Sequence, residues 1–229
     1  MALQRRIETI ADNVANANTA GFRAEQVRFE TVLSQVPLDP VAFASEGNTH
    51  ISRRSGEIVR TDNQLDVAVQ GDAWLSINTP AGQVYTRDGR FRMSDAGELQ
   101  TLNGYSVLDV GGAPILLDPN GGPPNIARDG TITQGNQQAG VIGLFRIDNL
   151  ATLTRYENSA VIPNIPATPV VEFTQVGVTQ GHIERANVNP VLEITRLVMV
   201  SRAYEAITNA INQSDSTLSE AVKALGSRS

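Results

Sequence analysis

No glycine, and no proline after Pro190, interrupts the segment from residue 190 to residue 225, so this part can form one long helix but not a series of short strands. Asn187, Asn189 and Pro190 at its start are residue types that favour a helix cap and a first helical turn. We therefore predict a helix over 190–225. At about 1.5 Å per residue it is roughly 50 Å long.

The apolar residues of this segment follow a heptad spacing. Those that recur every seven positions are Leu197, Tyr204, Ile211, Leu218 and Leu225. A second heptad position holds Ile194 and Val222 at its ends but Ser201, Thr208 and Asp215 between them, and Val198, Val200 and Ile207 widen the stripe on one side. A stripe this narrow suits a seam between helices rather than burial in a globular core.

The N-terminal segment predicts a second amphipathic helix. Its apolar stripe consists of Leu3, Ile7, Ile10, Val14 and Ala17, at alternating spacings of four and three. The helix is expected to end in the run Asn16–Gly21, because asparagine and glycine tolerate the left-handed conformation that closes a helix. Phe22 is then placed to anchor the chain as it leaves the helix.

The middle of the chain consists of short β-type runs separated by glycine, proline, asparagine and aspartate. Alternation predicts strands at 65–69 and 75–77, and the apolar run 141–147 predicts a buried strand. Asp88-Gly89, between two aromatic-flanked runs, predicts a hairpin over 85–91, and Arg128–Ile132 repeats this signal more weakly.

Together these patterns predict an α+β chain: a β-rich central domain flanked by N- and C-terminal amphipathic helices that form a coiled-coil-like terminal domain. The expected ranges are 1–33 for the N-terminal helix, 34–64 for an extended linker, 65–185 for the β domain and 186–229 for the C-terminal helix. The two helices either pair with each other within one monomer or pack against copies or relatives of the chain. Head-to-tail contacts that do not close a ring generate a helical filament.

Composition excludes several classes of function. The net charge of -6 and the pI near 5.0 argue against nucleic acid as a partner. The absence of cysteine excludes disulfides and thiolate metal sites, and His50 and His182 have no ligand-like neighbours. Neither a nucleotide-binding loop nor a nucleophile elbow occurs. We therefore expect no catalytic residues, no cofactor and no metal. No apolar stretch suggests membrane insertion or a cleaved signal peptide.

Five stretches of the chain resemble the flagellar rod, hook and hook-associated proteins, in the order in which that family has them. They are Ile10–Arg23, Leu65–Gly71 with Trp74, Tyr85–Phe91 followed by Asp95–Leu99, Gly181–Pro190, and Arg202–Glu205. Within the family, Asn187–Pro190 is more similar to a proximal rod protein than to the distal rod protein. Family members usually have further residues before the position of Met1, so we expect a truncated chain or an internal start.

The resemblance implies a structural subunit of the flagellar basal-body rod, a hollow drive shaft for motility. Its implied partners are copies of itself, other rod proteins and the flagellar type III export apparatus, and its implied location is the periplasmic rod. We expect the two ends to be largely disordered in the free subunit and to order on assembly. The alternatives are the distal rod protein and a secreted β-rich enzyme or binding module. The candidate interface residues are Leu3, Ile7, Ile10, Val14, Asn16, Phe22, Ile194, Leu197, Tyr204, Ile207, Ile211, Leu218 and Leu225.

Overall fold

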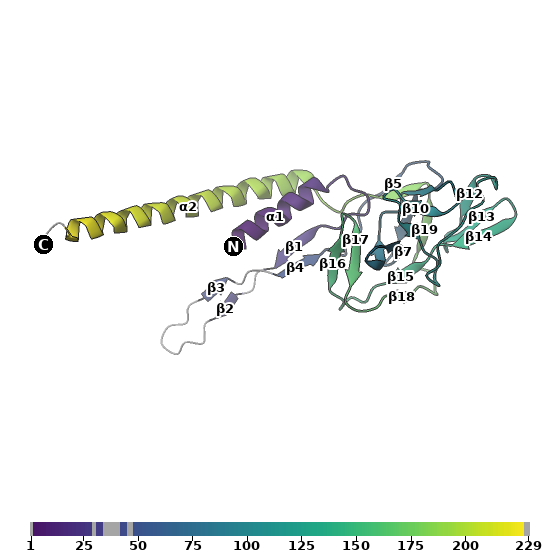
Figure 1. The fold of residues 1–229 in the computed structure, drawn as a ribbon, viewed down its shortest axis with the longest axis horizontal. Coiled ribbons are helices and arrows are strands. Elements are labelled where there is room, and N and C mark those ends of the chain that lie inside the picture. Colours follow the sequence, from purple (N-terminus) through teal and green to yellow (C-terminus); the bar gives the residue numbers. More distant parts are fainter. Residues whose placement is uncertain (1, 29–30, 34–41, 45–47, 227–229) are drawn as a thin grey trace. The chain divides into compact units, whose positions relative to one another are not determined.

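The computed structural model describes residues 2–28, 31–33, 42–44 and 48–226, and it divides the chain into two compact units (Figure 1). Met1–Ala15, Val27–Thr49 and Asn189–Ser229 form the first, here called the terminal unit. Asn16–Gln26 and His50–Val188 form the second, here called the β body. The described fold is β-rich with one helix towards each end, as the sequence predicts.

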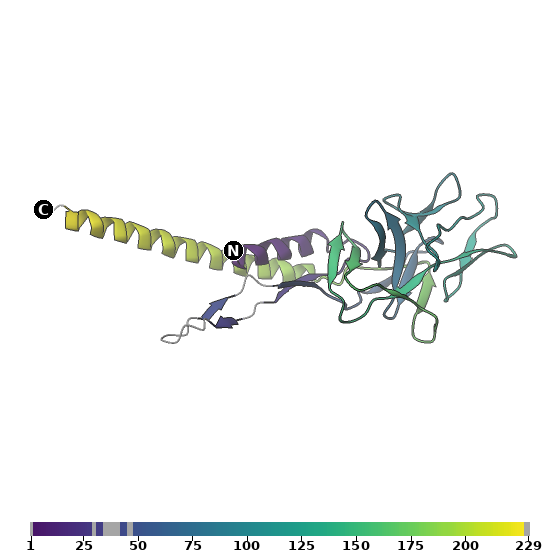
Figure 2. The same ribbon diagram turned by 60° about the horizontal axis from the view of Figure 1, so that its bottom comes forward.

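The terminal unit contains both helices, α1 (Ala2–Ala15) and α2 (Pro190–Gly226), and the strand pair β2 (Thr31–Leu33) and β3 (Ala42–Ala44). The Oδ1 atom of Asn189 accepts a hydrogen bond from the backbone N–H of Leu192 at 3.1 Å, the geometry of an N-cap. This confirms the predicted start of the long helix, with Asn189 as its cap. Helix α1 packs against α2, and both ribbon views place it beside the N-terminal part of α2 (Figures 1 and 2).

The β body is built on a nine-stranded sheet with β7 (Trp74–Thr79) near its centre. One path through this sheet is β16 (Leu153–Tyr156), β17 (Ala160–Pro163), β8 (Gly82–Thr86), β7, β11 (Ser106–Val107), β10 (Leu99–Thr101) and β9 (Phe91–Met93). Strand β15 (Leu144–Arg146) also pairs with β7, and β18 (Thr168–Pro169) pairs with β15. All these pairings are antiparallel. Strand β7 forms a hairpin with β8, which follows it in the chain, and also pairs with β11 and β15, which lie further along the chain.

Smaller sheets complete the described fold. Strands β12 (Pro124–Ile126), β13 (Thr131–Gln134) and β14 (Gln137–Val141) form a meander, and the turn between β12 and β13 confirms the weaker predicted hairpin. The remaining pairs are β6 (Val67–Gln70) with β19 (Gly177–Gln180), β5 (Ile58–Arg60) with β20 (His182–Glu184), and β1 (Glu25–Arg28) with β4 (Asn48–Ile51).

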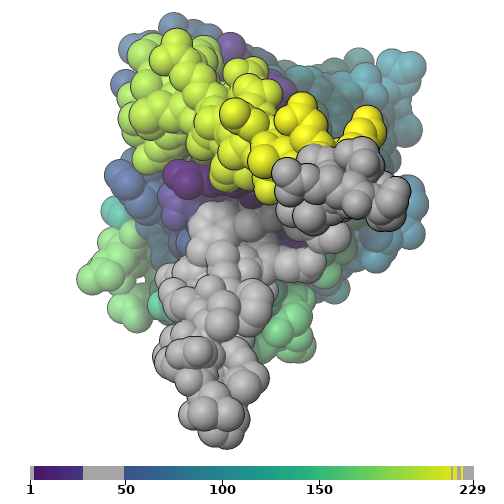
Figure 3. Space-filling view, turned by 90° about the vertical axis from the view of Figure 1, so that its left-hand side faces the viewer, coloured from purple at the N-terminus to yellow at the C-terminus, as the bar shows by residue number. Residues whose placement is uncertain are grey.

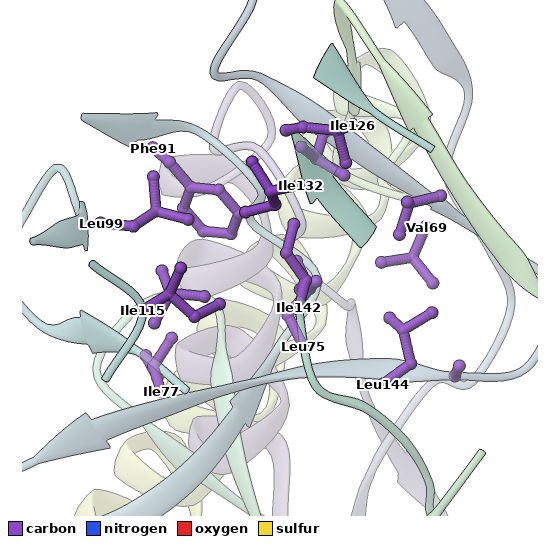
Figure 4. Packing of buried hydrophobic residues seen from close by; sticks show 14 of the residues in the cluster. Val69, Leu75, Ile77, Phe91, Leu99, Ile115, Ile126, Ile132, Ile142 and Leu144 are labelled. Carbon is purple, nitrogen blue, oxygen red and sulfur yellow. The ribbon is translucent and has the colours of Figure 1, made fainter. Parts of the chain in front are cut away.

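An aliphatic core fills the β body. Leu75, Leu99, Ile132, Ile142 and Leu144 come from different strands and loops and are almost fully buried. Their side chains converge with those of Ile77, Phe91, Ile115 and Ile126 (Figure 4). A second cluster gathers Trp74, Tyr85, Phe145 and Ile147. The predicted strands at 65–69 and 75–77 therefore supply core residues through β6 and β7.

The stronger predicted hairpin does not form. Strands β8 and β9 flank residues 87–90 but pair with other strands, β8 with β7 and β17, and β9 with β10. Arg87 is instead buried, and a Cβ atom on Gly89 would lie 1.8 Å from the carbonyl oxygen of Val67. Tertiary contacts of the loop thus override its local turn signal. The hairpin of this region is formed by β9 and β10, around Ser94–Glu98.

Two further segments contain pairings or breaks that their local sequence patterns do not predict. Within 34–64, expected as a linker, the structure has β3, β4 and β5, while 34–41 and 45–47 lie outside the described residues. Backbone pairing organises the described part of this segment: β3 pairs with the nearby β2, and β5 pairs with the distant β20, which local periodicity does not reveal. The expected strand 141–147 is divided into the end of β14 and β15, because Gly143 packs against the backbone of Leu108 and Asp109.

Replacing a core leucine tests the packing of the β body. We expect Leu75→Ala to lower the free energy of unfolding by about 2–5 kcal/mol, because it removes a fully buried side chain and leaves a cavity. Leu116→Ala is the matched control, since Leu116 is 62% exposed, and should change it by less than about 0.5 kcal/mol. Urea denaturation followed by the fluorescence of Trp74 measures both. Equal losses in the two variants would contradict the assigned core.

Candidate assembly surface and buried ion cluster

Helix α2 carries an exposed apolar surface along its described length. Of the predicted interface residues in α2, Ile194, Tyr204, Ile207 and Ile211 are exposed and Leu197 is half-buried. Val198 and Met199 are exposed beside them, whereas Val200 is buried. The side chains of Leu218 and Leu225 lie outside the described residues. In the space-filling view, α2 lies at the surface, in green to yellow (Figure 3).

Helix α1 places its predicted interface residues differently. Ile10 is buried, and Leu3, Ile7 and Val14 are half-buried, as is Asn16 just after the helix. The polar residues Thr9 and Asn13 are buried in α1, and Glu193 is buried in α2. Since α1 packs against α2, pairing of the two ends within one monomer accounts for part of the predicted seam. It does not account for the exposed residues further along α2.

Phe22 is a core residue of the β body and not a surface residue. Its side chain is 1% exposed, and the guanidinium carbon of Arg155 lies 4.3 Å from the ring centroid. The Arg155 Nη2 atom also donates a hydrogen bond to the carbonyl oxygen of Arg23 at 2.6 Å. The predicted role of Phe22 as an anchor for the chain after the helix fits this position. Its predicted role as a subunit contact does not, because the ring is already covered.

A buried ion cluster lies beside Phe22 and joins three segments of the chain. Arg23 Nη2 lies 2.8 Å from Glu184 Oε1, and Arg87 Nε lies 2.8 Å from Glu184 Oε2. All three side chains are 1–2% exposed. One carboxylate is therefore held between two guanidinium groups in the interior of the β body, where each oxygen accepts from a different arginine.

The surroundings of the ion cluster satisfy most of its remaining donors and acceptors. Arg87 Nη1 donates to the carbonyl oxygens of Gly71 and Ala73, and the backbone N–H of Gly56 donates to Glu184 Oε1 at 2.8 Å. The indole of Trp74 lies 5.6 Å from the guanidinium carbon of Arg23 and 5.9 Å from that of Arg87, within range of cation–π attraction.

Burial is the main influence on the protonation of the two arginines. It lowers the pKa of Arg23 to about 10 and also lowers the pKa of Arg87, while the negative charge of Glu184 opposes both shifts. A pKa near 10 still leaves the guanidinium of Arg23 positively charged at neutral pH. The ion cluster therefore holds full charges in a region of low polarity.

Backbone contacts fix the same segments. The N–H of Gly21 donates to the carbonyl oxygen of Glu184 at 2.8 Å, and the Oδ1 atom of Asn187 accepts from the N–H of Ala24 at 2.6 Å. Gly21 has φ = 68°, and a Cβ atom there would lie 2.2 Å from the backbone nitrogen of Asp88. A glycine is needed at this position both for the left-handed conformation and for the close approach.

Sequence reasoning missed the ion cluster. The cluster consists of residues that are far apart along the chain, Arg23, Arg87 and Glu184. The local sequence around each of them predicts a turn or a polar surface. The available signal was that all three lie within the stretches quoted for the family resemblance. Asn187 was predicted as a capping residue, but Asn189 caps α2 and Asn187 links Ala24 to Ser52 and Arg54 instead.

The described residues bear on two further features, metal binding and membrane spanning. Within the described residues, no group of three or more His, Asp or Glu side chains is arranged to hold a metal ion. His50 is exposed, and the Nδ1 atom of His182 lies 2.8 Å from the carbonyl oxygen of Gln180. Neither helix, over its described length, combines the length and hydropathy needed to cross a bilayer.

Three family descriptions match successive parts of the chain. "Flagella basal body rod protein" matches residues 1–23, "Flagellar hook protein FlgE/F/G D1 domain" matches residues 68–134, and "Flagellar basal body rod FlgEFG protein C-terminal" matches residues 179–224. Each match contains one member of the ion cluster: Arg23, Arg87 and Glu184 respectively. The contacts that join these segments in space are thus made by residues from all three matched regions.

Individual relatives match over nearly their whole length. A protein of Mesorhizobium japonicum named "Flagellar basal-body rod protein FlgF" is 51% identical over 100% of this chain and 95% of its own length. The FlgF protein of Rhizobium meliloti is 44% identical over 99% of this chain and 94% of its own. The FlgG rod protein of Buchnera aphidicola subsp. Schizaphis graminum is less similar, at 29% identity over 95% and 93%.

Removing the charge of Glu184 tests the ion cluster. We expect Glu184→Gln to lower the free energy of unfolding by about 3–5 kcal/mol, because it leaves two buried guanidinium groups without a counter-charge. Glu57→Gln is the matched control: Glu57 is 74% exposed, lies 3.9 Å from Arg185, and should contribute less than about 1 kcal/mol. Chemical denaturation of both variants measures the difference. If Glu184→Gln lowered the free energy of unfolding by less than Glu57→Gln does, the charge of Glu184 would not be needed to stabilise the ion cluster.

Proposed function

We propose that this chain assembles through the apolar surface of its terminal helices. The chain belongs to the flagellar basal-body rod protein family and is a structural subunit of the bacterial flagellar rod. The family is one of structural proteins and not of enzymes. Its members belong to the flagellar basal body and assemble with other rod and hook components. The greater identity to FlgF than to FlgG proteins favours the FlgF-like assignment over the FlgG-like one.

The exposed apolar residues of α2 carry the proposal. Ile194, Tyr204, Ile207 and Ile211 are each between 45% and 56% exposed in the single chain. Fully burying a side chain of this size gains about 1.5–3 kcal/mol relative to leaving it in water. Each of the four is already about half covered, so covering the rest gains roughly half of that amount apiece, which favours ordering of a helix that is marginal by itself.

The two described helices differ in length. Helix α1 has 14 residues and α2 has 37. At about 1.5 Å per residue, α1 is about 21 Å long and α2 about 55 Å. The described part of α1 is thus less than half as long as α2. In the proposed assembly, copies of this chain or related rod proteins supply partner helices for the exposed part of α2, in a coiled-coil-like terminal domain.

The proposal extends to the arrangement of the subunit in the rod and to its export. We infer that the helices lie innermost in a hollow shaft, with the β body outside, because the apolar surface belongs to the helices. The division of the chain into ranges 1–33, 34–64, 65–185 and 186–229 stays a prediction. Periplasmic assembly and export through the flagellar type III apparatus without a cleaved signal are further proposals, motivated by the resemblance to exported rod proteins. Passage through a narrow channel suits a chain whose ends order late.

Hydrogen exchange tests whether the end of α2 depends on partners. We expect the amide protons of residues 201–226 to exchange rapidly in a verified monomer and to become protected in assembled rods, because packing provides most helix stability. Amides of β7 in the central sheet serve as an internal reference and should be protected in both states. Strong protection across residues 194–222 in a proven monomer would count against the proposal.

Substitution at the seam tests the assembly surface. We expect Ile211→Asp to abolish incorporation into the rod, because it places a charge on an apolar contact, while the fluorescence of Trp74 shows a folded β body. Asn212→Asp is the matched control, since it adds the same charge at the next, exposed position and should assemble normally. Leu197→Asp provides a second seam variant. Normal motility of cells carrying only Ile211→Asp would exclude this surface.

A further inference from the structure

A cavity of about 240 Å³ opens beside the buried ion cluster in the β body. Its charged and polar lining consists of Arg23, Arg53, Arg87, Ser55, Asp72 and Asn149, and its aromatic wall is Trp74. All these residues belong to the β body, so the cavity is independent of the terminal unit and of the proposed assembly surface. The volume is sufficient for several water molecules or one small polyatomic ion, since a water molecule occupies about 30 Å³ in the liquid.

Positive charge exceeds negative charge around this cavity. Glu184 is the single carboxylate that contacts Arg23 and Arg87, and Asp72 is the one acidic residue among the lining residues. Arg53 adds a third cation, and its guanidinium donates to the carbonyl oxygens of Ile147, Asp148 and Ala151. Carbonyl groups satisfy its donors but do not neutralise its charge. Three cations thus face two anions.

Two buried donors of the ion cluster also lack an acceptor among the described residues. The Nε and Nη1 atoms of Arg23 are buried and have no hydrogen-bond partner in the described part of the chain. A buried charged donor without an acceptor costs more than about 1–3 kcal/mol, so such groups are rare unless something else binds there. On Arg87, by contrast, Nη1 donates to two carbonyls and Nη2 lies 3.3 Å from the Oγ atom of Ser55.

We propose that this cavity is a binding site for a small anion, a carboxylate group or an inorganic oxyanion, held by Arg23 with Arg53, Arg87 and the Ser55 hydroxyl. Guanidinium groups are well matched to both ligands, because their planar forks donate to two oxygens at once. A bound anion balances the excess positive charge and gives acceptors to a group that has unused donors. The two sources of this chemistry are an acidic side chain of another protein and a free ion.

The position of Trp74 provides a direct readout, because it is the only tryptophan of the chain and it lines the cavity. Its side chain is 2% exposed, so collisional quenchers in solution should reach it poorly. We expect iodide to quench Trp74 of the full chain in a saturable manner, about fivefold more efficiently than neutral acrylamide or cationic caesium, because the guanidinium groups concentrate the anion next to the indole.

Two substitutions, each of which removes one negative charge, test whether iodide quenches Trp74 from within the cavity. Asp72→Asn removes the acid that lines the cavity, and we expect the iodide concentration at half-saturation to fall about threefold, as one fewer nearby charge repels the anion. Asp95→Asn is the matched control, since Asp95 is exposed and does not line the cavity. It should leave the half-saturation unchanged. Neither substitution removes a buried residue, so both chains should fold.

Competition at constant ionic strength distinguishes a carboxylate group, as on an acidic side chain, from a free inorganic oxyanion. Displacement of iodide by acetate at lower concentrations than by sulfate supports a carboxylate ligand, and the reverse order supports an inorganic oxyanion. Quenching by iodide that is linear and no stronger than by acrylamide would overturn the proposal. So would an equal response of Asp72→Asn and Asp95→Asn. Since these measurements use the isolated chain, their outcome does not depend on rod assembly.

Discussion

The buried carboxylate of Glu184 holds together the segments on which the rest of the fold depends. It lies 2.8 Å from Arg23, which follows α1 in the chain, and 2.8 Å from Arg87 in the loop between β8 and β9. Glu184 itself ends β20, just before the chain continues into α2. Burying three charges is costly, and an apolar replacement of the whole group is often as stable. What the charges provide is a positional constraint, because Glu184 must lie where its two carboxylate oxygens meet Arg23 and Arg87.

The β body and the terminal unit differ in how completely each buries its own apolar side chains. In the β body, aliphatic side chains from many strands cover one another, and Leu75, Leu99 and Ile132 are completely buried. In the terminal unit, α1 packs against α2 but is less than half its length. The β body thus buries its apolar side chains within one chain, whereas α2 keeps exposed apolar side chains, which we propose to be covered by neighbouring subunits.

Sequence reasoning recovered features that depend on local pattern. The long C-terminal helix was predicted over 190–225 and is observed over Pro190–Gly226, because glycine and proline are absent between its ends. It failed where distant contacts decide: Asp88-Gly89 carries a hairpin signal, but burial of Arg87 and the approach of Gly89 to Val67 give the loop another shape. The ion cluster could not be predicted for the same reason, since no sequence spacing relates Arg23, Arg87 and Glu184.

The pairing of β7 with β8, β11 and β15 also affects how the chain reaches this structure. Leu75 in β7 lies opposite Leu144, and Ile77 lies opposite Val107, so the central strand must find partners from distant points of the chain. Folds dominated by such non-local contacts close large loops before they gain stability, and they fold in milliseconds to seconds rather than microseconds. Slow acquisition of the native topology leaves a newly made β body unfolded for longer, which would suit the export that we propose for this chain.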